Sequence, residues 1–262
     1  MVYKVKLSYS VVLYRNSVAD VLKLYRNLVE TVPCDCEYMI YLVNNSKDDT
    51  ELEQCLKQIA DSDENVILIT AEDNNGFGAG HNLAIRQANS AVHFLVNPDI
   101  TIPNSDQISK LVDKMRNQDI VMCAPKVLNT DGTIQKLVKH SPTVLDMGIR
   151  FLGRRILTKR QDWFVYSDEY NVTHESINLA GSFMACRTKT LKKIGGFDER
   201  YFLYMEDSDL TRSMARYGAT IYYPDAYVVH AWQRENRKSL KGIRIMLQSM
   251  GKYFAKWGWK LW

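Results

Sequence analysis

The sequence predicts an α/β fold with a mostly parallel sheet and helices on both of its faces. Short apolar runs alternate along the chain with segments whose apolar residues recur every three or four positions, as expected for strands and helices. The apolar runs are continuous, which is typical of strands that are buried on both faces. A chain of 262 residues, 46% of them hydrophobic, is long enough to bury one such core.

The first half of the chain alternates strictly between predicted strands and predicted helices. Strands are predicted at residues 9–14, 38–43, 66–70 and 92–96, and helices at 17–31, through Leu52, Cys55, Leu56 and Ile59, and at 79–89. Residues 126–178 have weak periodicity, so we expect a long, partly mobile excursion over the active face. Regular structure is then predicted for a strand at 183–187, helices at 188–194 and 207–217, and strand segments at 219–223 and 222–229.

Composition limits where the chain is expected to act. Its start lacks the apolar stretch of a signal peptide, and no apolar run approaches the length of a membrane-spanning helix. The five cysteines lack zinc-ribbon spacing and are expected to be reduced thiols. We therefore expect a cytoplasmic protein.

Charge divides the chain into two parts. Residues 231–262 carry a formal charge of +7, against −3 for the rest of the chain. Apolar residues in this tail recur at helical spacing, and three tryptophans end it: Leu240, Ile243, Leu247, Met250, Phe254, Trp257, Trp259 and Trp262. A basic helix with aromatic anchors suits the surface of an anionic membrane, whereas a helix packed on the domain with a solvated basic face is the alternative. We predict a catalytic domain at 1–232, a membrane-associating amphipathic segment at 233–262, and no nucleic-acid partner.

Polar residues cluster where predicted strands end, which is where open parallel sheets bind ligands. Tyr14-Arg15-Asn16 and Asn44-Asn45-Ser46 follow the first two strands and are equally compatible with ordinary turns. The segment NNGFGAGHN (residues 74–82) has three glycines that open a helix, whose free N–H groups suit an anion. Its spacing matches neither a Walker A loop nor a dinucleotide fingerprint, and a flexible turn is the alternative.

Carboxylates and a histidine are the candidates for chemistry. Asp99 ends the strand LVNPD, where a lone carboxylate suits a hard divalent cation holding a diphosphate, or simply caps a turn. Glu206, Asp207 and Asp209 open a predicted helix directly after aromatic residues, which favours either the helix dipole or a general base of raised pKa. His230 ends a strand as Asp99 does, so we expect the two to meet at one site.

These segments, taken in order, resemble the inverting glycosyltransferases of the GT-A fold known as family 2. The resemblance is carried by NNGFGAGHN, LVNPD, GSFMACR, GGFDERYFLYMEDSDLTR and YYPDAYVVH, and it extends from YSVVLY near the start to FAKWG near the end. Within the family the chain is most similar to bacterial rhamnosyltransferases of O-antigen and capsule assembly.

The resemblance implies a role for each cluster. Asp207 resembles the catalytic base, Asp99 the metal-binding acid of a D-x-D-like motif, and His230 the late histidine that completes the site for Mg²⁺ or Mn²⁺. Residues implied to contact the nucleotide sugar, or in two cases the acceptor, are Tyr14, Arg15, Asn44, Asn75, Gly76, Phe77, Gly78, Asn82, Asn97, Asp99, Gly181, Ser182 and Glu206. The implied acceptor is a polyprenyl-diphosphate-linked glycan on the inner face of the cell membrane.

The donor implied first is dTDP-L-rhamnose, and a UDP-hexose is the alternative. A 6-deoxy sugar needs an apolar wall for its methyl group, which residues 202–205 or Phe183 and Met184 would supply. Asn44 stands where family members commonly have Asp, which leaves the base open. Two other classes compete: a sugar nucleotidyltransferase, disfavoured because YSVVLYRNSVAD has no glycine, and a non-catalytic scaffold of polysaccharide assembly.

Overall fold

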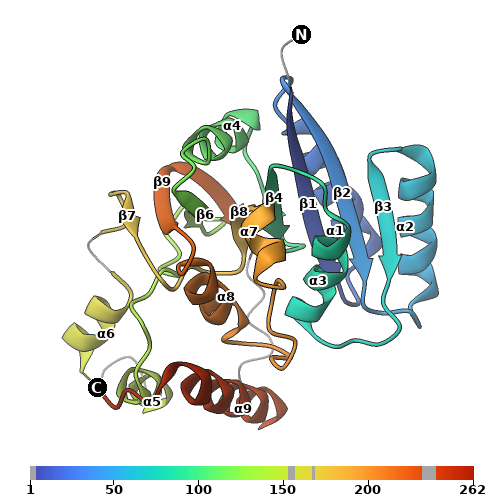
Figure 1. Ribbon diagram of the computed structural model, residues 1–262. Coiled ribbons are helices and arrows are strands. Elements are labelled where there is room, and N and C mark those ends of the chain that lie inside the picture. Colours follow the sequence, from blue (N-terminus) through green and yellow to red (C-terminus); the bar gives the residue numbers. More distant parts are fainter. Residues whose placement is uncertain (1–3, 153–156, 167–168, 232–239) are drawn as a thin grey trace.

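The computed structural model describes residues 4–152, 157–166, 169–231 and 240–262 (Figure 1). Within these residues one mixed sheet has the strand order β3-β2-β1-β4-β8-β6-β9-β5, and β7 pairs with β9. Its strands are β1 (Val5–Leu13), β2 (Cys36–Asn44), β3 (Val66–Thr70), β4 (Val92–Val96), β5 (Ile100–Thr101), β6 (Ile120–Leu128), β7 (His174–Glu175), β8 (Phe183–Arg187) and β9 (Ala219–His230). The first four strands are mutually parallel, β6 and β9 are parallel to each other, and β8 is antiparallel to both of its neighbours.

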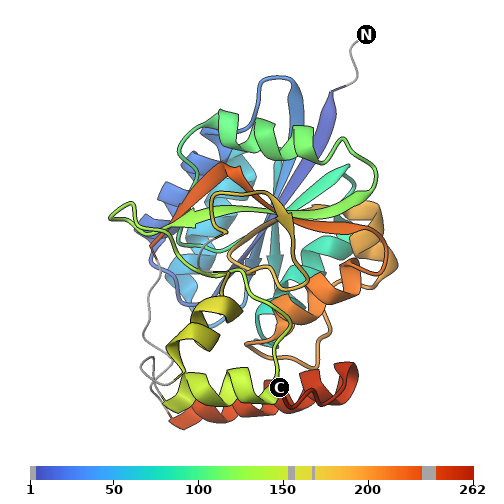
Figure 2. The same ribbon diagram turned by 90° about the vertical axis from the view of Figure 1, so that its left-hand side faces the viewer.

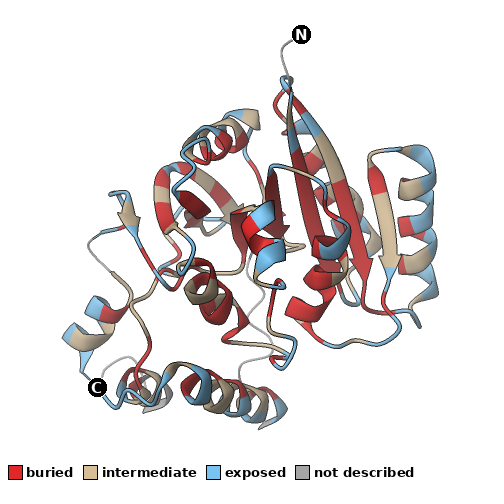
Figure 3. Ribbon diagram, in the orientation of Figure 1, coloured by how far each residue is buried: buried red, intermediate tan, exposed pale blue. Residues whose placement is uncertain are grey.

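Helices cover both faces of the sheet, as predicted. They are α1 (Val18–Glu30), α2 (Thr50–Ser62), α3 (Phe77–Gln87), α4 (Ser105–Lys114), α5 (Val144–Leu152), α6 (Thr158–Phe164), α7 (Thr188–Lys193), α8 (Glu206–Met214) and α9 (Leu240–Trp257). Val11 packs with the apolar faces of α1, α2 and α4, whereas the next residue, Val12, packs with α3 on the other side. Adjacent residues of β1 are therefore buried in two different hydrophobic cores, one on each face of the sheet. This explains why the apolar run of β1 is continuous (Figure 3).

Three elements that follow the fourth predicted strand were not predicted, namely the two-residue strand β5, helix α4 and strand β6. Helix α4 has only ten residues, and strand β6 contains Pro125, where its register against β9 shifts. Proline cannot donate to a strand ladder, which weakens the sequence pattern of a strand. Helix α4 and strand β6 nevertheless bury apolar residues in the main core.

The excursion expected at 126–178 reaches the cavity that contains Asp207, and it holds regular elements that its weak periodicity did not predict. This segment forms α5, α6 and β7, and Val138, Phe164 and Tyr170 are buried. Each helix is short, so its period is hard to detect in sequence. Residues 153–156 and 167–168 lie outside the described residues.

The basic tail forms the predicted helix α9, and that helix packs on the rest of the chain. Tyr253 and Phe254 are buried in a small core with Tyr201 and Met205. Figures 1 and 2 show α5, α6 and α9 together at one end of the molecule. No helix in the described ranges is long and apolar enough to cross a membrane, and all five cysteines are free thiols.

Candidate functional site

A cavity of about 690 Å³ lies at the carboxyl ends of β1 and β4. Its floor is the edge of the parallel sheet, α1 forms one wall, and the loop before α8 and the start of α9 form the others. Lining residues relevant to ligand binding are Tyr14, Asp20, Lys23, Asn27, Asn45, Asn74, Gly76, Phe77, Asn97, Asp99, Phe202, Leu203, Tyr204, His230, Lys241 and Ile245. Of the predicted site residues, six line this cavity: Tyr14, Gly76, Phe77, Asn97, Asp99 and His230.

Asp99 and His230 meet in this cavity, as expected. Ile100 pairs with His230 in the antiparallel contact of β5 with β9, and this brings the preceding residue, Asp99, beside the imidazole. Asp99 Oδ1 lies 3.0 Å from His230 Nε2, with the histidine buried and the carboxylate partly exposed.

Gln135 contacts the His230 ring nitrogen that does not face Asp99. The Gln135 Nε2 group donates to Asn129 Oδ1 and to the His230 carbonyl, each at 2.8 Å. Its Oε1 therefore faces His230 Nδ1 at 3.0 Å, and because an amide oxygen only accepts, Nδ1 carries the proton. A ring held in this way presents Nε2 to Asp99, which is the arrangement that second-shell partners impose on metal-binding histidines. Gln135 was not predicted as a site residue, because it lies 95 residues from His230 in a segment of weak periodicity.

Unpaired buried polar atoms gather around the cavity. Asn45 Oδ1 and Asn97 Oδ1 line it, and Ser182 Oγ lies beside Asn97, whose N–H donates to the Ser182 carbonyl at 2.9 Å. Among the described residues these three oxygens have no hydrogen-bond partner. Buried polar atoms are normally paired, so unpaired ones at a cavity indicate a bound ligand or ordered water.

The acidic residues at the start of α8 lie in two different environments. Asp207 Oδ1 accepts from the Ser208 N–H at 2.7 Å, and its Oδ2 accepts from the Gly181 N–H at 3.2 Å. Burial, together with the neighbouring Asp207, raises the pKa of Glu206 to about 8. Asp209 instead points into the protein, where Lys256 Nζ and Trp257 Nε1 donate to it at 2.8 and 2.7 Å. Asp209 therefore holds α9 in place.

The backbone before α8 is strained next to these acids. Tyr204 and Met205 have φ angles of 69° and 67°, in the left-handed region that non-glycine residues avoid. Such strain costs on the order of 1–3 kcal/mol per residue and is concentrated at functional sites. Tyr204 lines the large cavity and also a second cavity that contains Glu206 and Asp207.

The glycine-rich segment differs from the prediction, because the start of α3 is covered by the chain itself. Gly76 has a φ of 98°, and a Cβ there would lie 2.0 Å from the Phe202 carbonyl oxygen. That carbonyl accepts from the Phe77 N–H at 3.2 Å. The loop at residues 197–202 thus occupies the position that was predicted for an anion.

Several predicted ligand residues make contacts within the chain. The Asn82 amide binds the backbone of Phe197 in both directions, and the Gly78 backbone packs against the Phe197 ring. The Asn44 side chain donates to Glu53 Oε2 and accepts from the Ser46 N–H. Asn45, rather than Asn44, lines the cavity. The local sequence around these residues is the same whether a side chain binds a ligand or another part of the chain. The sequence alone therefore does not distinguish the two roles.

Other predicted residues lie outside the large cavity. Arg15 and Asn75 are exposed at its margin, and Arg15 Nη2 lies 3.5 Å from Asp48 Oδ2. Gly181 lies between Phe77 and Asp207. The apolar wall comes from Phe202, Leu203 and Tyr204, whereas Phe183 and Met184 are fully buried core residues.

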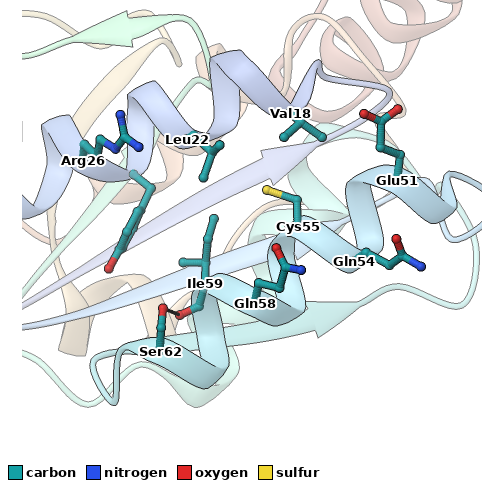
Figure 4. A pocket seen from close by; sticks show the side chains of 10 residues that line it. Val18, Leu22, Arg26, Glu51, Gln54, Cys55, Gln58, Ile59 and Ser62 are labelled. Carbon is teal, nitrogen blue, oxygen red and sulfur yellow. Dashed lines mark hydrogen bonds between the residues drawn. The ribbon is translucent and has the colours of Figure 1, made fainter.

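A third depression lies between α1 and α2 on the outer face of the sheet (Figure 4). Val18, Leu22, Cys55 and Ile59 form its apolar floor, and its lining includes none of the predicted site residues. It lies along the sides of two helices rather than at the carboxyl edge of the sheet, and we do not assign it to the site.

Known proteins resemble the chain in sequence. Residues 10–194 match the model of Glycosyl transferase family 2. The rhamnosyltransferase WbbL of Escherichia coli K12 is 27% identical over 246 residues, which is 88% of each chain. The N-acetylglucosaminyl-diphospho-decaprenol L-rhamnosyltransferase of Mycobacterium tuberculosis is 27% identical over 180 residues, covering 63% of this chain and 59% of that protein.

Solved structures share the fold. The mannosyltransferase PcManGT of Pyrobaculum calidifontis, in complex with GDP-Man and Mn²⁺, superposes with a TM-score of 0.66 at 16% identity, covering 97% of this chain and 65% of that one. Staphylococcus aureus TarS in complex with UDP superposes with a TM-score of 0.60 at 17% identity, covering 95% and 72%. The predicted GT-A fold is confirmed.

Proposed function

Because the chain belongs to glycosyl transferase family 2 and is therefore a glycosyltransferase, we propose that it transfers L-rhamnose from dTDP-L-rhamnose to a polyprenyl-diphosphate-linked glycan of a bacterial surface polysaccharide. The relatives named above are rhamnosyltransferases, and the mycobacterial one is named for a decaprenyl diphosphate acceptor. The observation that carries the proposal is the pair of Asp99 and His230 in a cavity at the carboxyl edge of the sheet, with Gln135 bonded to His230.

The large cavity has the chemistry to hold a nucleotide sugar. The unpaired Asn45 Oδ1 offers an acceptor for the base or ribose, and Lys23 and Lys241 bring positive charge for a diphosphate. Phe202 and Leu203 add an apolar wall for the methyl group of a 6-deoxy sugar. Such a wall discriminates only modestly, by roughly a hundredfold against an added hydroxyl.

Asp99 and His230 fit a divalent cation. The Asp99 carboxylate is a suitable oxygen ligand for Mn²⁺ or Mg²⁺, and the His230 imidazole beside it would add a nitrogen ligand. The described residues contain no group of three or more protein ligands, so in this proposal diphosphate and water oxygens complete the coordination. When bound, the ion would neutralise the charge that develops on the leaving diphosphate.

Asp207 is the proposed general base. Burial, and then the neighbouring Asp207, raises the pKa of Glu206, whereas the Asp207 carboxylate lines the second cavity and is held by the chain. Hydrogen bonds from Gly181 and Ser208 orient that carboxylate. Asp207 removes the proton from the acceptor hydroxyl, whose oxygen attacks the anomeric carbon as the diphosphate leaves from the opposite face, which inverts the anomeric centre.

We further propose that the protein binds peripherally to the inner face of the cell membrane. Trp259 and Trp262 at the end of the chain are 62% and 82% exposed, and Leu247 is also exposed on α9. Lys241, Arg244 and Lys260 are exposed in the same segment. Exposed aromatic and basic side chains together suit an anionic interface.

A donor competition experiment tests the proposed function. The purified protein, with Mn²⁺ and N-acetylglucosaminyl-diphospho-decaprenol, is offered dTDP-L-rhamnose, UDP-glucose, UDP-galactose and UDP-N-acetylglucosamine. We expect rhamnose to be transferred fastest. Faster transfer from any UDP-sugar would replace the proposed donor, and no transfer from any donor would favour a non-catalytic scaffold.

A further inference from the structure

We propose that the second cavity, on the Asp207 side of Tyr204, is the acceptor site and that it binds the first isoprene units of a lipid-linked sugar together with its polar head. This inference rests on the proposed function. The cavity has a volume of about 370 Å³ and is lined by Lys139, Pro142, Met147, Phe164, Asn178, Tyr204, Met205, Glu206, Asp207, Ser208, Ile243 and Met246.

The polar residues of this cavity lie at the proposed base. Asp207 and Ser208 are adjacent, and Ser208 Oγ donates to Asn178 Oδ1 at 2.7 Å. Lys139 and Glu206 line the same cavity. A carboxylate, a lysine and an amide in one place suit a sugar hydroxyl with a diphosphate behind it.

The remaining lining is apolar and comes from three helices. Met147 belongs to α5, Phe164 to α6, and Ile243 and Met246 to α9. Their side chains offer no hydrogen bonds to the hydroxyls of a soluble oligosaccharide. They instead suit a hydrocarbon chain, whose removal from water stabilises the complex.

The same three helices expose apolar side chains on their outer surface. Leu145 of α5, Trp163 of α6 and Leu247 of α9 are exposed, each within two residues of a residue that lines the cavity. Figures 1 and 2 show these helices side by side at one end of the molecule. The helices that line the cavity therefore also carry exposed apolar side chains at the end of the molecule where the proposed membrane-binding tail lies. This placement favours a lipid-linked acceptor over a free glycan.

Both cavities meet at the proposed base. Tyr204 lines both of them, and Gly181 lies between Phe77 of the donor cavity and Asp207 of the acceptor cavity. An acceptor in the second cavity places its hydroxyl on Asp207. The O–H proton passes to Asp207, the oxygen forms a bond to the anomeric carbon, and the bond from that carbon to the diphosphate oxygen breaks with its electron pair on the diphosphate.

Cavity-filling variants test the inference. Met246→Trp and Met147→Trp fill the cavity from two different helices, and Gln248→Trp, at an exposed position of α9, is the matched control. The acceptors are N-acetylglucosaminyl diphosphates of decaprenol and of geraniol in detergent micelles, with donor at saturation. Wild type and control should have a KM for the decaprenyl acceptor about tenfold below that for the geranyl acceptor, and both cavity variants should lose this preference.

Two further measurements separate the outcomes. Calorimetric dTDP binding should be unchanged in every variant, and a loss of dTDP binding with an unchanged acceptor KM would overturn the assignment. Retention of the chain-length preference in both cavity variants would also overturn it, because partition into micelles would then explain the preference. If wild type transfers no sugar, the proposed function fails, and direct binding of the decaprenyl acceptor by thermophoresis still decides whether Met246→Trp closes its site.

Discussion

At the scale of single residues, the site depends on partners that set the state of each functional group. Gln135 fixes the tautomer of His230, and Gly181 and Ser208 orient Asp207. Glu206 is buried beside Asp207 and has one carboxyl oxygen that lacks a hydrogen-bond partner among the described residues. The reactive groups are thus prepared before any ligand arrives, which reduces the reorganisation needed during the reaction.

The base assignment predicts that Asp207→Asn removes transfer and keeps donor binding. An amide keeps the shape of the side chain but cannot accept the proton, and losing a general base costs roughly a hundred- to ten-thousand-fold in kcat. Turnover is measured with dTDP-L-rhamnose, and dTDP affinity is measured by calorimetry. A variant that retains more than about a tenth of wild-type kcat would contradict the assignment.

The second-shell role of Gln135 predicts a metal-dependent defect. Gln135→Leu removes the acceptor for His230 Nδ1, and loss of such a partner lowers metal affinity by roughly ten- to a hundredfold. Titration of activity with Mn²⁺ after EDTA treatment should show this shift, whereas Gln58→Leu on the exposed face of α2 should behave as wild type. Full activity of the wild type in excess EDTA would disprove the metal role.

The buried carboxyl of Glu206 predicts a dependence of stability on pH. Its pKa is raised from 4.5 to about 8 by burial and then by Asp207. The folded protein therefore holds this proton more tightly than the unfolded chain does, so its contribution to stability is complete below pH 4.5 and is lost as pH rises through 8. Glu206→Gln stays neutral and should avoid this loss.

Urea denaturation across this pH range measures the effect. We expect the unfolding free energy of the wild type to fall, relative to Glu206→Gln, by on the order of 1 kcal/mol per pH unit. Glu64→Gln, at an exposed position, should follow the wild type. Parallel curves for wild type and Glu206→Gln would show that Glu206 is charged in the folded protein.

At the scale of elements, helix α9 is both a structural and a functional part of the molecule. Its middle buries Tyr253 and Phe254, and its start contributes Lys241 and Ile245 to the donor cavity and Ile243 and Met246 to the other. One helix can do this because residues three or four apart share a face. Removing the whole tail would therefore expose core residues as well as detach the proposed membrane contact.

Asp209 connects α8 to α9 and should be needed for this packing. Asp209→Asn weakens the hydrogen bonds from Lys256 and Trp257, and loss of a buried bond to a charged group costs roughly 2–3 kcal/mol. Urea denaturation measures the change. Asp113→Asn, which removes an exposed ion pair with Arg116, should change stability by less than about 1 kcal/mol.

At the scale of the whole molecule, one end carries the exposed apolar and basic side chains of the tail. Trp259→Ser combined with Trp262→Ser should lower binding to phosphatidylglycerol vesicles by about tenfold, because two interfacial anchors are lost. Co-sedimentation measures binding, and Tyr217→Ser, which removes an exposed aromatic residue near α8, is the control. The proposed membrane face would be contradicted if the double tryptophan variant and the Tyr217→Ser control lost vesicle binding equally, or if neither lost it.

The sequence by itself determined the α/β class, the first four strands and the helices between them, and the positions of Asp99 and His230 at strand ends. These features follow from local patterns, because the spacing of apolar residues shows which faces an element buries. The sequence placed both residues at strand ends on one edge of the sheet, but the contact itself is made by the unpredicted strand β5, which pairs antiparallel with β9.

Only the tertiary structure decided which polar residues face a ligand and which face the chain. Asn44 and Asn45 are neighbours of the same type, yet only Asn45 lines the cavity, because Glu53 occupies the other amide. Asn82 is bound to Phe197, 115 residues away, and Gln135 to His230, 95 residues away. Local periodicity carries no information about such distant partners, since they are chosen by the packing of whole elements against one another.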